Sequence, residues 1–434
     1  MVFVAHQLIE KAIEHDTPLY VIFVDLKKAY DSIPREALWL VLGKLGIPPT
    51  LLSLIRSLHV GMRARVRISG RLTEDIYVNN GLRQGCTLAP TLFNLYFAAV
   101  MSSWRSRSSV PGVSLRSRPG RKLVGDRTTK ARLNTYQVTE SQFADDAAVY
   151  TTSREHLETL ANEFIACASQ WGLTVSIAKT KAIAVGPGDL QPDVVLDGGG
   201  VVEMVSGFTY LGSVVSCDGS LDVEITSRLA KASRVFGCLL TPIFRCRGLS
   251  IGIKCMVYRA FVLSTLFYGA ETWAVKATHV HRLAVFHRSC IRSILGVSRI
   301  QQWEDRLTSA ELGRRFGMSL DISDLLRQHR LRWLGHIARM EEHRTPQQMV
   351  FGELYATRPR HGPKKRWRDV VVTDLAAAQI GEGEWFHQAQ DRPTWKRLCR
   401  QQPPPPGPKE FRCACGRPFG RIGDLKRHAP HCRV

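Results

Sequence analysis

Short apolar runs and alternating segments predict strands in the first half of the chain. Residues 20–25 form an apolar run that ends in an aspartate, and residues 142–151 form a second strand-like run. Residues 63–78 alternate between polar and apolar side chains around Ser69-Gly70, which is the pattern of a hairpin. Residues 185–205 are rich in glycine and aspartate, which indicates a loop or a small hairpin.

Helical spacing separates these strands and then dominates the second half of the chain. Residues 35–60 place leucines at helical spacing before a break at Pro48-Pro49, and residues 155–170 are amphipathic. From residue 221 to about residue 378 the pattern is almost wholly helical. Strand, helix, strand pair, helix and strand, in this order, predict an α+β fold in which an antiparallel sheet is backed by helices.

Three carboxylates stand at the ends of the predicted strands. Asp25 ends the first run, and Asp145 and Asp146 are neighbours at a hairpin tip in the second. Adjacent carboxylates stay ionised at modest cost only when a divalent cation or another positive charge lies between them. Such a set suits two Mg²⁺ ions, the arrangement used for in-line displacement at phosphorus. Aspartates also favour turns, so the tetrad Phe143–Asp146 alone leaves an ordinary turn open.

A glycine-rich segment and an aromatic residue lie between the two acidic sites. Residues 80–90 combine glycines, which let backbone approach a ligand closely, with Gln84, whose amide both donates and accepts hydrogen bonds. Pro90 suits the first turn of a following helix. Tyr30 follows soon after Asp25 and is a candidate for stacking under a sugar, although a core aromatic residue would give the same pattern.

The ordered set of motifs resembles the palm of a reverse transcriptase from a non-LTR (LINE-like) retrotransposon. Asp25–Ser32 (DLKKAYDS), Arg83–Asn94 (RQGCTLAPTLFN) and Phe143–Asp146 (FADD) carry the resemblance, which covers roughly residues 1–400. Each motif alone is weak, whereas the set in this order is highly specific. Later segments that resemble the same elements are a palm motif at 171–181, the primer-grip hairpin at 208–212, and thumb or post-thumb segments at 268–273, 330–336 and 362–367.

The resemblance implies an RNA-directed DNA polymerase that transfers nucleotides from dNTPs onto a primer 3′-hydroxyl with the help of two Mg²⁺ ions. Asp25, Asp145 and Asp146 would be the catalytic residues and the magnesium ligands. The implied partners are an RNA template, a DNA primer or target, and dNTPs. The implied substrate-binding residues are Leu26 (backbone amide at the phosphates), Tyr30 (sugar), Gln84 and Gly85 (nascent base pair and template), and Lys179 (triphosphate or leaving group).

The resemblance also suggests how the chain is divided. We expect a palm at 1–215 with its fingers largely missing, a helical thumb and post-thumb region at 216–400, a proline-rich linker at 401–410 and a zinc finger at 411–434. Only 24 residues precede Asp25, so we expect an element truncated at its 5′ end. The alternative function is therefore a catalytically inactive truncated relic that only binds nucleic acid.

The last three cysteines and two histidines form a candidate zinc site. Cys415, Phe419, Leu425 and His428 match the framework of a ββα finger, in which an aromatic residue and a leucine pack against the metal. The pair Cys413-Ala414-Cys415 has a shorter spacing than usual, and a disordered tail is the alternative. A zinc-finger transcription factor is disfavoured, because one finger reads only about three base pairs. The expected Zn²⁺ ligands are Cys413, Cys415, His428 and Cys432, with His431 as the substitute for Cys432.

Charge and cysteine usage support a nucleic-acid partner in a reducing compartment. The chain has 60 Lys and Arg against 38 Asp and Glu, a net charge of +22, which suits a polyanion because phosphate neutralisation releases counterions. Basic residues crowd segments 105–132 and 358–368, which could also be solvated loops. Eight cysteines are scattered singly, and no secretory signal or membrane span is visible, so we expect a nuclear or cytoplasmic protein that is not secreted.

Overall fold

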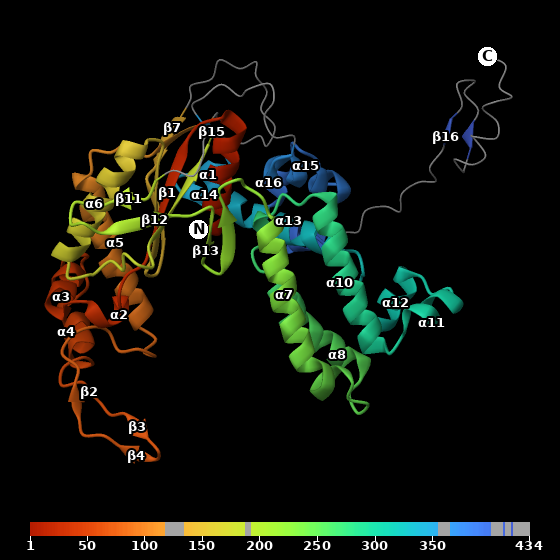
Figure 1. Cartoon of the computed structure of the whole chain (residues 1–434), viewed down its shortest axis with the longest axis horizontal. Helices are drawn as coiled ribbons and strands as arrows, with labels where there is room; N and C mark the ends of the chain where they lie inside the picture. The colour runs from red at the N-terminus through yellow and green to blue at the C-terminus, as the bar shows by residue number, and fades with distance from the viewer. Residues whose placement is uncertain (118–133, 187–191, 355–364, 401–410, 413–417, 420–434) are drawn as a thin grey trace.

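The computed structural model describes residues 1–117, 134–186, 192–354 and 365–400, together with two short strands at 411–412 and 418–419. Figure 1 shows a sheet-containing body formed by the first half of the chain, from which a set of long helices extends. The chain then returns, so that α13 and α15 lie near α1 at the start of the chain. This arrangement is an α+β fold with a predominantly helical second half.

A six-stranded sheet in the order β11-β12-β10-β1-β9-β8 forms the centre of the first half. Its central strand β1 pairs antiparallel with β10 on one side and with β9 on the other. The expectation of a purely antiparallel sheet is wrong at one edge, because β12 pairs parallel with β10. The chain reaches the edge strand β11 before it turns back into β12, which reverses the direction of β12. The strands of this sheet are β1 (Leu19–Val24), β8 (Glu140–Phe143), β9 (Asp146–Thr151), β10 (Lys181–Val185), β11 (Val194–Val195) and β12 (Val201–Met204).

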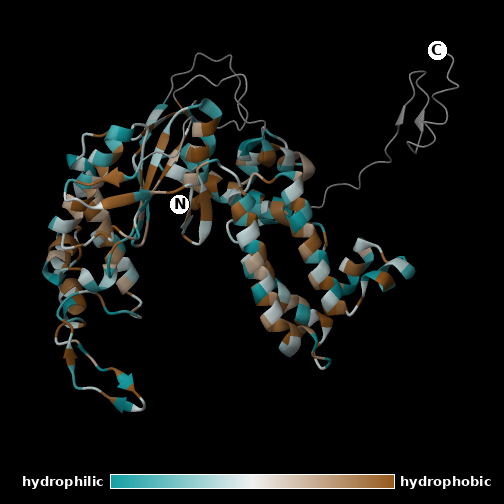
Figure 2. Cartoon of the chain, in the orientation of Figure 1, coloured by the Kyte–Doolittle hydropathy of each residue, from teal (hydrophilic) through white to brown (hydrophobic). Residues whose placement is uncertain are grey.

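Strand β1 is buried on both faces, because successive side chains point to opposite sides of a strand. Ile22 and Val24 belong to an apolar cluster with α5 and α6, whereas Val21 and Phe23 belong to a second cluster with α1 and the late helices. Figure 2 shows the apolar character of these central strands. The helices of the first half are α1 (Val2–His15), α2 (Ala29–Ser32), α3 (Arg35–Lys44), α4 (Pro49–Ser57), α5 (Ala89–Arg107) and α6 (Arg154–Gln170).

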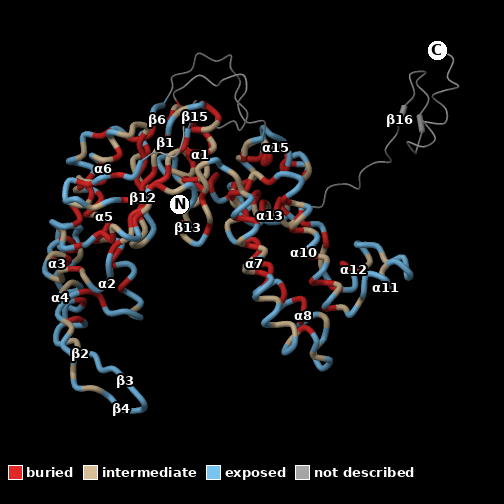
Figure 3. Tube along the Cα trace, viewed as in Figure 1, coloured by how far each residue is buried: buried red, intermediate tan, exposed pale blue. Residues whose placement is uncertain are grey.

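The predicted hairpin at 63–78 is confirmed and extends from the end of α4 (Figure 3). Ser69 and Gly70 have φ values of 49° and 83°, the conformation of a tight turn matched to the twist of paired strands. Nearly all of its side chains are exposed. Its strands are β2 (Arg63–Ala64), β3 (Arg67–Ile68), β4 (Arg71–Leu72) and β5 (Ile76–Tyr77).

The described part of the second half is mostly helical, as expected, and two of its segments are π-helical. The apolar stretch at 255–275 is divided into several helical segments, and the chain leaves the helix at Gly269, whose φ of 78° does not continue a helix. In the described part of the chain, no helix is both long and apolar enough to span a bilayer. The helical segments are α7 (Asp222–Leu239), η1 (Leu240–Phe244), α8 (Ile251–Val257), η2 (Tyr258–Leu263), α9 (Ser264–Leu266), η3 (Ala270–Thr272), α10 (Ala277–Leu295), α11 (Arg299–Glu304), α12 (Ser309–Phe316), α13 (Ile322–Ala338), α14 (Thr345–Phe351), α15 (Trp367–Ala377), α16 (Trp385–Gln388) and α17 (Arg392–Leu398).

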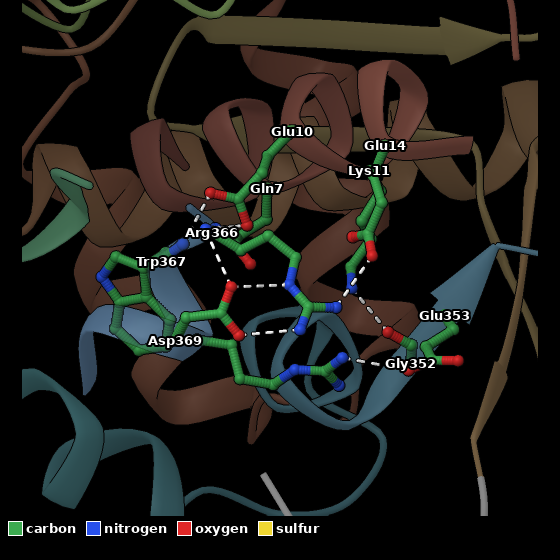
Figure 4. Close-up of polar contacts among 10 residues, drawn as sticks. Gln7, Glu10, Lys11, Glu14, Gly352, Glu353, Arg366, Trp367 and Asp369 are labelled. Atoms are coloured by element: carbon green, nitrogen blue, oxygen red, sulfur yellow. Dashed lines mark hydrogen bonds and ion pairs between the residues drawn. The ribbon is translucent and has the colours of Figure 1, made fainter. Parts of the chain in front are cut away.

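The late helices share a core with the sheet. Figure 4 shows the polar contacts that hold the start of α15 against α1: Arg366 donates to Glu14 at 2.8 Å, and the Trp367 amide donates to Glu10 at 2.7 Å. Lys11 donates to the Gly352 carbonyl at 2.6 Å, beside a strand that joins a second, three-stranded sheet. The remaining strands are β6 (Val113–Ser117), β7 (Asn134–Val138) and β15 (Gly352–Leu354) of that sheet, the hairpin β13 (Gly207–Tyr210) and β14 (Ser213–Ser216), and the pair β16 (Phe411–Arg412) and β17 (Pro418–Phe419).

Candidate active site

The sheet register brings Asp25 next to the acidic hairpin. Val24, the last residue of β1, is paired with Ala147 of β9. Asp25, which follows Val24, therefore lies opposite Asp146. On the other side, Phe143 of β8 is paired with Asp146. Ala144 and Asp145 therefore form the two-residue connection between β8 and β9, with Ala144 at a φ of 52°. Backbone pairing thus gathers the three predicted carboxylates at one end of the sheet.

The pKa of Asp146 reflects the proximity of the other two carboxylates. Burial raises the pKa of Asp146, and the negative charges of Asp145 and Asp25 raise it further. A raised carboxyl pKa means that the ionised form is disfavoured at this position. The hairpin therefore carries a negative charge density that an additional cation would relieve.

Asp25 is fixed from the opposite side by the segment at 174–180. Its carbonyl accepts from the Ser176 amide at 2.7 Å, and its amide donates to the Thr180 hydroxyl at 3.3 Å. The ammonium of Lys179 lies 3.7 Å from Asp25 Oδ2, so that Lys179 supplies one positive charge at the site. Thr180 is a residue that the sequence did not single out, and its contact with Asp25 spans 155 positions.

The carboxylate set has the chemistry of a magnesium site. Asp25 Oδ2 is buried and has no hydrogen-bond partner, which leaves a lone pair available to a cation. Oxygen ligands are what Mg²⁺ prefers, and it retains several waters when one or two carboxylates hold it. Among the described residues, no three His, Cys, Asp or Glu side chains are close enough to form a complete metal-binding cluster. The oxygen donors suit magnesium by type and charge, although in this arrangement they do not form a closed cluster.

Tyr30 and Leu26 lie beside the carboxylates. Tyr30 stacks on Phe93 of α5 with ring centroids 4.5 Å apart, and its pKa is raised by burial and by the charge of Asp145. Its ring is thus partly packed on the core while its hydroxyl faces the acidic hairpin. Leu26 is buried and forms an isolated antiparallel bridge with Val175.

The glycine-rich loop docks directly onto the segment that follows β1. The Leu82 amide donates to the Tyr30 carbonyl at 2.8 Å. A side chain at Gly81 would place its Cβ 2.6 Å from the Asp31 backbone, so glycine is required there. Gly85 has no atom within 4 Å of the place that a Cβ would take, so a side chain would fit there. Its φ of 83° is the reason that glycine is favoured at this position. Gln84 donates to the carboxylate of Asp31, a neighbour that the sequence did not identify.

The hairpin β13–β14 packs on the same strand that carries Asp25. Phe208 and Tyr210 lie 5.1 Å and 4.7 Å, between ring centroids, from Phe23 of β1. The tip residues Leu211 and Gly212 have φ values of 47° and 78°, which is the geometry of a two-residue hairpin turn. Residues 207–216 therefore form a compact hairpin near the carboxylates.

Two side chains from the helical half hold the tip of this hairpin, and sequence reasoning did not predict these contacts. The Tyr268 hydroxyl donates to the Leu211 carbonyl at 2.7 Å, and Arg228 donates to the Gly212 carbonyl. The Arg228 guanidinium lies 4.5 Å from the centroid of the Tyr268 ring, which is a cation–π contact. Glu224 is fully buried and accepts from Arg228 at 2.7 Å and from the Val214 amide at 2.7 Å. The segment 268–273 was noted by resemblance, but no local pattern predicts these contacts, because they join segments distant in sequence.

The predicted zinc ligands Cys413, Cys415, His428 and Cys432, and the substitute His431, lie outside the described residues. Much of the two basic segments, at 118–133 and 355–364, also lies outside them.

The first half of the chain matches a known protein family. Residues 3–215 match the family described as reverse transcriptase (RNA-dependent DNA polymerase). The chain is 24% identical over 279 residues to a transposon-derived protein of Caenorhabditis elegans, covering 62% of this chain and 98% of that protein. It is also 24% identical to the RNA-directed DNA polymerase from the mobile element jockey of Drosophila funebris, covering 63% of this chain but only 28% of the relative.

Two further similarities cover more of the chain. The probable RNA-directed DNA polymerase from transposon X-element of Drosophila melanogaster is 23% identical, over 85% of this chain and 37% of the relative. A solved telomerase from Candida tropicalis, in complex with a fragment of telomeric RNA, is 13% identical with a TM-score of 0.34, covering 80% of this chain and 50% of that one. Residues 3–215, just under half of the chain, therefore match the reverse transcriptase family, and the similar proteins include RNA-directed DNA polymerases of the mobile elements jockey and X-element.

Proposed function

We propose that this chain is an RNA-directed DNA polymerase that extends a primer 3′-hydroxyl with dNTPs. The observation that carries the proposal is the register of β1 and β9, which gathers Asp25, Asp145 and Asp146 in a domain of the reverse transcriptase family. Because the chain spans only 28% of the jockey relative and 37% of the X-element relative, the activity of those longer proteins enters here as part of the proposal.

Reverse transcriptases as a family use Mg²⁺. In our proposal Asp25 and Asp145 hold two Mg²⁺ ions and Asp146 supports them. When bound, the ions lower the barrier to attack on the α-phosphate and stabilise the charge that develops on the leaving group. The chain itself supplies the carboxylates at one end of the sheet, and Thr180 and Ser176 hold the Asp25 backbone in place.

The other predicted residues have complementary roles. Tyr30 lies against the sugar of the incoming nucleotide, since its ring is braced by Phe93 and cannot withdraw. Gln84 and Gly85 line the nascent base pair and template, and the Leu26 amide faces the phosphates. Lys179 balances the Asp25 charge and can turn toward a triphosphate, since its side chain is largely exposed. All of these residues lie near the carboxylates, and in this proposal each contacts one part of the substrate.

The remaining regions provide nucleic-acid contacts in this proposal. Residues 216–400 act as thumb and post-thumb on an RNA template and a DNA primer or target, and residues 411–434 form a zinc finger after the linker at 401–410. The protein acts in the nucleus or cytoplasm. The net charge of +22 supports a polyanionic partner.

The second candidate is a catalytically inactive relic that binds nucleic acid only. The basic charge supports it equally well, whereas the retained carboxylate triad favours the polymerase. Both functions require nucleic-acid binding, and only the polymerase incorporates nucleotides.

Primer extension with a matched binding assay separates them. The purified chain with Mg²⁺, an oligo(dT) primer on poly(A) and labelled dTTP should incorporate nucleotide, and Asp145→Asn should abolish incorporation while leaving primer–template binding intact. Asp197→Asn, an exposed aspartate outside the site, is the matched control and should behave as the wild type. Binding without incorporation by the wild type would select the relic, and failure to bind at low salt would overturn both functions.

A further inference from the structure

The helix α11 presents two large apolar side chains to solvent. Trp303 is 81% exposed, the highest value among the large apolar residues of the described chain, and Ile300 is 68% exposed. In Figure 1, α11 and α12 project from the end of α10 on the side away from α7. Trp303 therefore lies outside the carboxylate site and needs a separate explanation.

The backbone that carries Trp303 is rigidly braced. Ser298 and Gln301 exchange two hydrogen bonds, of 3.0 Å and 2.9 Å, that cap the start of α11. The side chain of Gln302 donates to the Leu307 carbonyl at 3.1 Å and accepts from Arg292 of α10 at 3.3 Å. A fixed backbone lowers the entropy lost when a ligand packs on the indole.

Two arginines line the same hollow as the indole. Arg299, Trp303 and Arg306 line one open hollow of about 650 Å³, together with Gln302, Glu304 and Leu307. Arg306 has a φ of 51°, and its amide donates to the Trp303 carbonyl at 3.1 Å, so a tight turn keeps the two residues close in the backbone. Within the described residues, neither Arg299 nor Arg306 forms an ion pair.

The surrounding charge is positive despite two acidic residues. Glu304 and Asp305 follow Trp303, and four arginines oppose them, at positions 288, 292, 299 and 306. Burial lowers the pKa of Arg292, and the neighbouring positive charges of Arg299 and Arg288 lower it further. An anion that also has an apolar face would relieve this repulsion and cover the indole.

We propose that Trp303, Arg299 and Arg306 form a binding site for unpaired RNA, in which a base stacks on the indole and the flanking phosphates contact the two arginines. Aromatic stacking with cationic tracking of the backbone is how single strands are bound without regard to sequence. RNA rather than DNA is assigned because, given the proposed polymerase function, the strand that is unpaired before copying is the RNA template. Trp and Arg are also enriched in protein interfaces, so a second copy of the chain is the competing occupant that the oligomeric state tests.

Fluorescence anisotropy of a labelled, unstructured oligouridylate on the full chain tests the site. A saturating, unlabelled, blunt RNA–DNA hybrid first occupies the polymerase cleft. Trp303→Ala should weaken oligouridylate binding about tenfold, whereas Trp303→Phe, which keeps a stacking ring, should remain within about threefold of the wild type. Arg299→Gln and Arg306→Gln should each reduce the slope of log K against log salt by about 0.7.

Ile300→Ala is the matched control, because it removes an exposed apolar side chain from the same helix and should leave RNA binding unchanged. Unchanged binding by Trp303→Ala would overturn the proposal, and so would tighter binding of oligodeoxyuridylate than of the RNA. Equal losses for Ile300→Ala and Trp303→Ala, with a dimer of the wild type that both variants dissociate, would instead assign the surface to a second copy. Extension of a recessed oligo(dT) primer on poly(A) tests the polymerase site separately. Asp145→Asn should abolish that extension and leave oligouridylate binding unchanged, so failure of the polymerase site and failure of the Trp303 site give different results.

Discussion

The side-chain nitrogen of Gln84 lies 2.9 Å from Oδ1 and 3.1 Å from Oδ2 of Asp31, across 53 positions of sequence. The Asp31 carboxylate accepts from the side-chain NH₂ group of Gln84. The side-chain oxygen of Gln84 therefore remains available to accept a hydrogen bond from a ligand. Asp31 is thus a positioning residue for the glycine-rich loop, next to the Asp25 site but outside the carboxylate set.

Asp31→Ala should lower kcat/KM for dNTP roughly tenfold, because a hydrogen bond to a charged group contributes about 1.5 kcal/mol. Gln84→Ala should cause a similar loss, and the double variant should lose little more than either one. Steady-state primer extension on the three variants forms a double-mutant cycle that measures the coupling. Fully additive losses would show that Asp31 does not act through Gln84.

The Asp146 carboxyl should make the folded chain less stable as the pH rises. Its folded pKa is raised by burial and by Asp145 and Asp25, so the folded state binds a proton more tightly than the unfolded state does. Stability is then lost as pH rises from the unfolded pKa, about 3.9, through the raised folded pKa. In magnesium-free buffer at neutral pH, Asp146→Asn should therefore melt at a higher temperature than the wild type.

That difference in melting temperature should vanish below pH of about 3.9, where both states are protonated. Asp197→Asn, which replaces an exposed aspartate, should show no difference at either pH. An Asp146→Asn protein that melts below the wild type at neutral pH would contradict the repulsion between the three carboxylates.

The late helices should tolerate no side chain at Gly335 of α13. A Cβ there would lie 2.0 Å from Nε1 of Trp395, which is buried and donates to the Leu331 carbonyl at 2.8 Å. Gly335→Ala should cost about 1–3 kcal/mol of unfolding free energy, the usual cost of overpacking. Gly237→Ala in α7 has no atom within 4 Å of the new Cβ and should stabilise by about 0.5–1 kcal/mol. Urea unfolding of the two variants measures both values.

Local patterns predicted the parts of the site that depend on local structure. The apolar run before Asp25 and the acidic hairpin were identifiable because each strand and its terminal carboxylate are contiguous in sequence. The contacts of Asp31 with Gln84 and of Thr180 with Asp25 were not, because they depend on how distant loops dock. The parallel β10–β12 pair was missed for a related reason, since hydrophobic alternation carries no information about strand direction.

The last prediction concerns the hairpin at 207–216, which resembles a primer grip. Tyr268 and Arg228 hold the carbonyls of Leu211 and Gly212, so the tip is tied to the helical region. Tyr268→Phe removes one hydrogen bond, about 1 kcal/mol, but keeps the ring beneath the Arg228 guanidinium. If the tip positions the primer, KM for primer–template should rise about fivefold while KM for dNTP and the melting temperature change little. Tyr136→Phe on β7 removes a hydroxyl elsewhere and should change neither KM. A Tyr268→Phe protein with a lower melting temperature and an unchanged KM for primer–template would show that the contact only stabilises the fold.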